Sequence, residues 1–186
     1  MTASEVEKHI RECIRFWVWS GYNDADSVEE MLPDVLEDGV DAPAMYAAIT
    51  DEFAEKSRAE ADWPQRTDCD RLDAAFVALD ADGICAVQYA GYTMSDGFSE
   101  VAEALEQRGR KKYHGYCFFH AQDVERAIDG HGLMVAFGDV DGDATKAAEV
   151  GRRICAALQD AGLRVLWDND VKERIQIPDI VWQRRY

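Results

Sequence analysis

His120 and Asp123 are the two side chains whose types and spacing best suit proton transfer. A histidine has an ordinary pKa of about 6.5, which suits general acid–base work near neutral pH, and Asp123 is placed to orient the imidazole. The same pair fits a structural role, because His120 stands where a predicted strand becomes a helix and Asp123 lies in the first helical turn. His120 and Asp123 are therefore candidate catalytic residues, with helix capping as the alternative.

Three aspartates, Asp139, Asp141 and Asp143, form an acidic loop whose hard oxygen ligands suit Mg²⁺ or Ca²⁺. The spacing does not match an EF-hand, which needs a glycine and a glutamate where this chain has Ala144 and Val150. The three residues are candidate metal ligands, and a solvated turn that caps the next helix is the alternative. No dinucleotide, P-loop, hydrolase or zincin motif is present, and we expect no cofactor.

The cysteines indicate reduced thiols. Their number is five, no Cys-x-x-Cys pair occurs, and most lie in apolar periods, which predicts a cytoplasmic protein. Cys117 precedes His120 by three residues, but residues three apart in a strand point to opposite faces, so Cys117 is predicted to be a core residue. No secretory signal is visible, and no apolar run approaches the ~20 residues of a membrane span.

Short apolar strands alternating with amphipathic helices must position these residues. The predicted helices of this part cover 68–81, 96–108, 121–129 and 144–161, and the predicted strands cover 84–89, 115–119, 133–137, 163–167 and 174–177, with a last short edge strand at 180–183. The strand at 174–177 is expected to form a hairpin with 163–167, which makes the sheet mixed. The predicted fold class is α/β, with a mixed, mainly parallel sheet of about five strands flanked by helices.

The N-terminal part has helical periodicity only. Helices are predicted over 4–20, 27–38 and 43–61, with a kink or a break into two short pieces at Pro33. Trp63-Pro64 marks a boundary between a helical N-terminal section, 1–64, and an α/β section, 65–186. The apolar faces are continuous, so we expect one cooperative unit.

Polar residues follow four of the predicted strands, namely Tyr92, His120, Asp139 and Asp168. If neighbouring strands run parallel, their crossovers bring all four residues to one edge of the sheet. We therefore predict a binding site formed by Tyr92, His120, Asp139, Asp141 and Asp168.

The net charge of −17 is unevenly distributed. Residues 1–62 carry −11 and residues 63–186 carry −6. Such a chain repels nucleic acid phosphates and anionic lipid, so we expect neither nucleic acid nor membrane as a partner. The one basic cluster, 108–112, is short and is expected to complement a helix C-terminus. The acidity predicts a basic protein partner, or else serves solubility alone.

Three runs carry a resemblance: FFHAQDVERA from Phe118, GLMVAFG from Gly132 and GLRVLWD from Gly162. Together with Arg174-Ile175 and Trp182, they resemble an uncharacterised bacterial family, a domain of unknown function. The resemblance covers about the last 75 residues. It implies a bacterial, cytoplasmic protein without an established activity, and it draws attention to His120, Asp123 and Asp168.

Two functions follow as hypotheses. The first is a non-enzymatic, acidic protein-binding module, immunity-like or adaptor-like, which holds a basic protein. The alternative is a metal-assisted, hydrolase-like enzyme. In it His120 would be the general base, Asp123 would orient it, and Asp139, Asp141 and Asp168 would hold the cation. The oligomeric state stays open.

Overall fold

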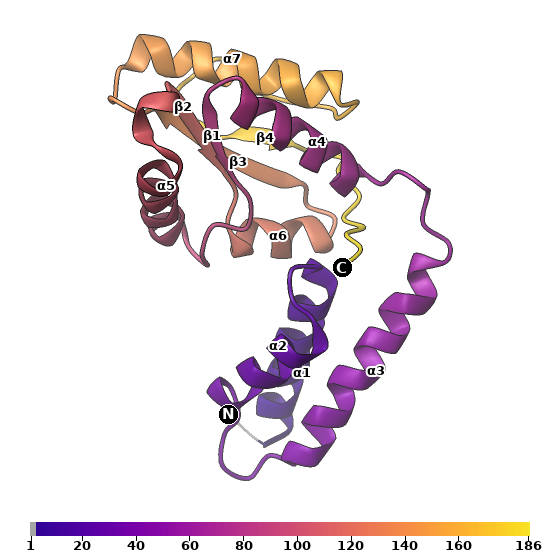
Figure 1. Ribbon diagram of the computed structural model, residues 1–186. Helices are drawn as coiled ribbons and strands as arrows, with labels where there is room; N and C mark the ends of the chain where they lie inside the picture. Colours follow the sequence, from indigo (N-terminus) through magenta and orange to yellow (C-terminus); the bar gives the residue numbers. More distant parts are fainter. Residues whose placement is uncertain (1–2) are drawn as a thin grey trace. The chain divides into compact units, whose positions relative to one another are not determined.

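The computed structural model describes residues 3–186, which belong to two compact units (Figure 1). The helical unit comprises the chain up to Gln65 together with Gln183–Tyr186, and the α/β unit comprises Arg66–Trp182. The last four residues of the chain therefore belong to the same unit as the N-terminal helices, although they are far apart in the sequence. That both units unfold in one transition stays a prediction.

The helical unit contains α1 (Ala3–Ser20), α2 (Ala25–Met31), a 3-10 turn η1 (Leu32–Asp34) and α3 (Ala42–Glu60). Asp24 caps α2 by accepting the N–H of Ser27 at 2.8 Å. The predicted break at Pro33 is confirmed, because α2 ends at Met31 and Pro33 lies in the 3-10 turn.

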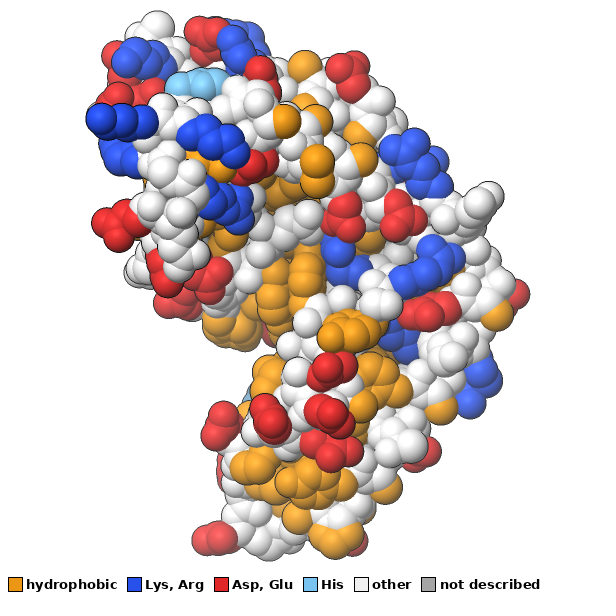
Figure 2. Space-filling model, viewed as in Figure 1, with side chains coloured by type: hydrophobic (Ala, Val, Ile, Leu, Met, Phe, Trp, Pro, Cys, Tyr) orange, Lys and Arg blue, Asp and Glu red, His pale blue; other side chains and the backbone are white. Residues whose placement is uncertain are grey.

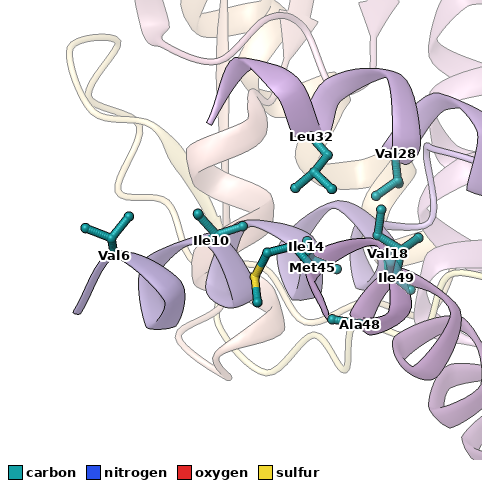
Figure 3. Close-up of a cluster of buried hydrophobic side chains, with 9 residues drawn as sticks. All are labelled: Val6, Ile10, Ile14, Val18, Val28, Leu32, Met45, Ala48 and Ile49. Atoms are coloured by element: carbon teal, nitrogen blue, oxygen red, sulfur yellow. The ribbon is translucent and has the colours of Figure 1, made fainter. Parts of the chain in front are cut away.

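The core of the helical unit is apolar (Figure 3). Nine buried side chains from α1, α2, η1 and α3 fill it: Val6, Ile10, Ile14, Val18, Val28, Leu32, Met45, Ala48 and Ile49. Lys56 is also buried, and its Nζ donates to the carbonyl of Val18 at 3.1 Å. This hydrogen bond offsets part of the cost of burying the ammonium group. At the chain end, Tyr186 donates to Asp24 at 3.3 Å, and the Arg184 guanidinium stacks over the Tyr22 ring.

The α/β unit has a four-stranded sheet in the order β1-β2-β3-β4. Its elements are α4 (Asp68–Ala81), β1 (Ile84–Val87), α5 (Met94–Arg108), η2 (Arg110–Lys112), β2 (Gly115–Phe118), α6 (Ala121–Ile128), β3 (Leu133–Asp139), α7 (Ala144–Asp160) and β4 (Ile175–Ile177). Figure 1 shows α4 and α7 on one face of the sheet and α5 on the other. The predicted α/β class with a mixed sheet flanked by helices is confirmed.

The expectation of a mainly parallel sheet is wrong. Only β1 and β2 are parallel, and β3 is antiparallel to both β2 and β4. The reason is α6, which has 8 residues and a length of about 12 Å. It lies across the end of the sheet and does not return along a face (Figure 1), so β3 begins at the edge where β2 finishes.

The sheet has four strands and not the expected five, because residues 163–167 form a single isolated β-bridge. Leu166 exchanges two hydrogen bonds with Gln176, at 2.9 and 3.0 Å, on the side of β4 away from β3. Directly afterwards the chain turns, with the Trp167 indole donating to the carbonyl of Asp170 at 3.0 Å. The turn ends the pairing after one residue, and residues 180–183 form no strand.

No helix within residues 3–186 combines the length and the apolar character that crossing a membrane requires.

Candidate functional site

The parallel pair β1 and β2 brings two predicted site residues together. Beyond the strands, Ala90 donates its N–H to Phe119, and Ala121 donates its N–H to Gly91, both at 2.9 Å. Tyr92 and His120 therefore stand at the same edge of the sheet, as parallel neighbours require. The exposed Tyr92 hydroxyl donates to Glu125 of α6 at 3.5 Å.

A polar cluster, the His120 cluster, lies at this edge and consists of buried His120 and Asp123 with half-buried Arg174. The Asp123 carboxylate, only 1% exposed, accepts the backbone N–H of His120 at 3.2 Å and a guanidinium N–H of Arg174 at 2.8 Å. The first contact caps α6 through Asp123, whereas the structural alternative from the sequence assigned the cap to His120 and gave Asp123 a favourable place at the helix dipole. The second ties the start of α6 to the segment that enters β4.

The His120 ring is buried, and burial lowers its pKa below the ordinary value of 6.5. The neighbouring Asp123 carboxylate opposes this shift, whereas Arg174 adds to it. Nδ1 lies 3.3 Å from Oδ2 of Asp123 but has no hydrogen-bond partner within the described part of the chain. Burial therefore favours the uncharged form of the His120 ring.

The cluster contains an imidazole that could act as a base, but the protein closes it off from solvent. A general base must reach the proton that it removes, and the His120 side chain is only 6% exposed. Asp123 is already occupied by the helix start and by Arg174. The cluster therefore acts first as a structural link between α6 and the entry to β4.

The sequence interpretation missed Arg174 as a member of this cluster. The alternation Arg174-Ile175-Gln176-Ile177 assigned it to the solvent-facing side of a strand. Hydrophobic periodicity indicates that a side chain points away from the core. It does not indicate whether a buried carboxylate of another element lies beside that side chain.

A small groove of about 260 Å³ begins next to Arg174. Its lining comes from α5, β3 and the loop before β4: Met94, Phe98, Ala136, Phe137, Val171, Lys172, Glu173 and Arg174. This volume is below the ~300–1,000 Å³ usual for a ligand cavity. A second groove of about 510 Å³ lies between α4 and α7 and is lined largely by alanines of both helices.

The structure separates Asp139 from His120, against the predicted common edge. Asp139 pairs with Gly115, where β2 starts, whereas His120 follows the other end of β2. Five residues of strand at ~3.3 Å each put them roughly 16 Å apart. The antiparallel β3 is the cause, because its carboxyl end points away from those of β1 and β2.

The carboxylates of the acidic loop are engaged within the protein. Oδ2 of buried Asp139 accepts the N–H groups of Asp141 and Asp143, at 2.9 and 3.0 Å. Asp143 caps α7, and backbone hydrogen bonds from Lys146 and Thr145 lower its pKa. Asp141 pairs with Arg110 at 2.9 Å. The loop thus has the geometry of the predicted alternative, a turn that caps the next helix.

Asp168 lies in the turn before β4, where it is exposed and accepts the N–H of Asp170 at 3.0 Å. It does not follow a strand of the sheet, because residues 163–167 form only the bridge at Leu166. Among residues 3–186, no group of three or more His, Cys, Asp or Glu side chains is arranged to hold a metal ion.

The basic cluster of 108–112 gathers at one corner of the α/β unit, over η2 and the end of α5 (Figure 2). Asp80 accepts from Arg108, Lys112 and Tyr113, at 2.9 to 3.1 Å. Burial alone would raise the pKa of Asp80, but the hydrogen bonds from Tyr113 and Lys112 bring it below the ordinary value. The cluster therefore binds α5 and η2 to α4.

Comparison with known proteins gives a family. No curated protein and no solved structure matches the chain. One family model matches residues 3–186, nearly the whole length. The match extends well beyond the part of the sequence, about its last 75 residues, that carried the resemblance. The chain belongs to the family described as Domain of unknown function (DUF6891).

Proposed function

We propose that this protein is a non-enzymatic binding module that holds a basic protein partner on the acidic surface of its helical unit. The observation that carries the proposal is the acidic segment, residues 26–41. It contains seven Asp or Glu residues and no Lys or Arg, and all seven are exposed. Figure 2 shows carboxylates gathered on the visible face of this unit.

These seven carboxylates lack cationic neighbours. The ion pairs of the helical unit, within the described residues, join Lys8 to Glu12, Arg15 to Glu52 and Lys56 to Glu60, and none involves the acidic segment. Unpaired like charges create a negative potential that speeds the encounter with a basic surface. Asp41 caps α3 by accepting the N–H of Ala44 at 3.1 Å, and the other six carboxylates are available to a partner.

A groove on the same unit supports a basic partner. It measures about 220 Å³, lies between α1 and α3, and is lined by Arg11, Ile14, Ala48, Asp51, Glu52 and Glu55. Buried Ile14 and Ala48 supply apolar lining, Glu52 is paired with Arg15, and Asp51 and Glu55 are exposed carboxylates. A Lys or Arg side chain suits such a site, because its stem packs on apolar surface while its charged end reaches carboxylates.

The predicted catalytic residues do not favour an enzyme. The base His120 is enclosed, and Asp139 and Asp141 hold their own loop and Arg110. The proposal places the protein in the cytoplasm, because all five cysteines are free thiols, as is usual in a reducing compartment. An immunity-like inhibitor of a basic toxin and an adaptor for a basic protein are the two forms it takes.

The experiment compares capture of partners from cell lysate by three versions of the full chain. The test variant combines Glu29→Gln, Glu30→Gln and Asp34→Asn in the acidic segment. The control combines three α5 changes, Glu100→Gln, Glu103→Gln and Glu106→Gln, and alters the net charge equally. We expect a partner that binds the wild type and the control at low salt, is released by high salt and binds the test variant roughly tenfold more weakly.

Two results would contradict the proposal. One is the absence of any partner whose capture depends on salt. The other is a partner that binds the test variant and the control equally, because net charge rather than the acidic segment would then explain retention.

A further inference from the structure

The helical unit carries a pair of metal-ligating side chains that the proposed binding function does not use. His9 and Cys13 lie one turn apart on α1, and Nε2 of His9 is 3.8 Å from Sγ of Cys13. His9 is exposed and Cys13 is half-buried, so solvent reaches the pair. Residues four apart share one side of a helix, which directs both side chains toward the same point.

The separation of the two atoms fits a tetrahedral metal ion. Zinc binds histidine nitrogen at about 2.0 Å and cysteine sulfur at about 2.3 Å, so a tetrahedral angle sets nitrogen and sulfur about 3.5 Å apart. The observed 3.8 Å differs from this value by a few tenths of an ångström. Small changes in side-chain torsions are sufficient to close that difference, and α1 need not move.

The surroundings favour a cation. Residues 1–62, which include His9 and Cys13, carry a formal charge of −11. The other cysteines differ. Cys69, Cys85 and Cys117 are buried, and burial raises the pKa of the half-buried Cys155 to about 11. A thiol must lose its proton to bind a metal, and Cys13 combines solvent access with an adjacent imidazole.

We propose that His9 and Cys13 form a bidentate site for a soft divalent cation of the zinc class. Nε2 of neutral His9 and the Cys13 thiolate are the two protein ligands, and water fills the remaining positions. Binding forms the sulfur–metal bond and releases the thiol proton to solvent, with no change of oxidation state. The site is independent of the acidic segment and of any protein partner.

The test titrates the purified full chain with Co²⁺, whose thiolate complexes absorb in the near ultraviolet through charge transfer. We expect one equivalent of Co²⁺ to give this band, to release one proton and to be displaced by Zn²⁺. Mg²⁺, which prefers oxygen ligands, should not displace it. His9→Ala and Cys13→Ser should each weaken binding roughly tenfold or more, and Cys13→Ser should abolish the band.

Two matched variants serve as controls. Cys155→Ser removes a half-buried cysteine of α7, and His131→Ala removes an exposed histidine of the α/β unit. Both should bind Co²⁺ like the wild type. The proposal is overturned if the wild type gives no band, if the band persists in Cys13→Ser, or if His9→Ala binds as tightly as His131→Ala. Circular dichroism of each variant confirms that the helices remain folded.

Discussion

Three carboxylates of the α/β unit and the acidic segment of the helical unit have opposite environments. In the α/β unit Asp123 binds Arg174, Asp139 binds its own loop, and Asp80 binds the basic cluster. In the helical unit the acidic segment faces solvent without a cationic partner. The residues that most resemble catalytic groups are thus bound into the fold, whereas the charges that fit no motif are free to meet a partner.

The cores of the two units also differ in the polar groups that they contain. The helical unit buries nine aliphatic or thioether side chains and one lysine, whereas the α/β unit buries polar side chains where its strands end. Stability of the helical unit therefore rests mainly on apolar packing, with Lys56 as its buried charge. In the α/β unit it also rests on hydrogen bonds to buried charges, whose loss leaves a partner unsatisfied.

The largest expected effect comes from the packed core of the helical unit. Ile14 is fully buried, and Ile14→Ala should lower the free energy of unfolding by about 3–4 kcal/mol through lost contacts and a cavity. If both units unfold together, circular dichroism and tryptophan fluorescence should report the same shifted denaturant transition. Two separate transitions, with only one of them shifted, would show that the units are independent.

Removing the buried carboxylate of the α/β unit should have the next largest effect. Asp123→Ala leaves Arg174 without its partner and the start of α6 without its cap, and should lower the free energy of unfolding by about 3 kcal/mol. The control is Asp141→Ala, because Asp141 and Arg110 form an exposed pair and the expected loss is below about 1 kcal/mol. Equal losses in urea denaturation would remove the distinction between buried and exposed pairs.

The buried His120 predicts a smaller effect that depends on pH. Its pKa in the folded protein lies below 6.5, so between 6.5 and that lower value the unfolded chain takes up a proton that the folded chain does not. The free energy of unfolding should therefore fall as the pH is lowered from about 7.5 to about 5.5. Denaturation at both pH values measures the difference.

The variant His120→Gln should lose this part of the pH dependence, whereas His131→Gln, at an exposed histidine, should keep it. A His120→Gln protein with the same dependence as the wild type would mean that His120 is not the group responsible.

The smallest effect on stability is expected in the acidic segment. The triple change of Glu29, Glu30 and Asp34 to their amides should alter the free energy of unfolding by less than about 0.5 kcal/mol, because all three are exposed and unpaired. Urea denaturation at low salt is the measurement. A loss above about 1 kcal/mol would show that these carboxylates support the fold, which would weaken the comparison between the units.

The helices could be predicted closely from the sequence. The predicted range 68–81 is the observed α4, and the predicted 144–161 differs from α7 by one residue at its end. Helical periodicity is local, and caps such as Asp24 act within a few residues. The prediction of a strand at 163–167 was wrong because a strand needs a neighbour to pair with. The chain turns at 168, so only Leu166 of this segment pairs with β4.

The candidate site could be predicted only in part. Tyr92 and His120 meet because β1 and β2 are parallel, and the role of Asp123 at the start of α6 follows from its position in the first turn. The sequence placed Asp139 at the wrong edge of the sheet. The predicted length of α6 did not show that this helix crosses the end of the sheet instead of returning along one face. Arg174 was missed because it reaches Asp123 across 51 positions of the chain.

The sequence by itself determined the class of the fold, the positions of the helices, the burial of Cys117 and the concentration of negative charge in residues 1–62. These properties depend on composition and on periods of two to four residues. Tertiary structure alone decided the direction of β3, the insertion of β4 beside it and the partners of each carboxylate. A hydrophobic pattern records which side chains leave water, but the same pattern suits either strand direction and any partner that packing brings near.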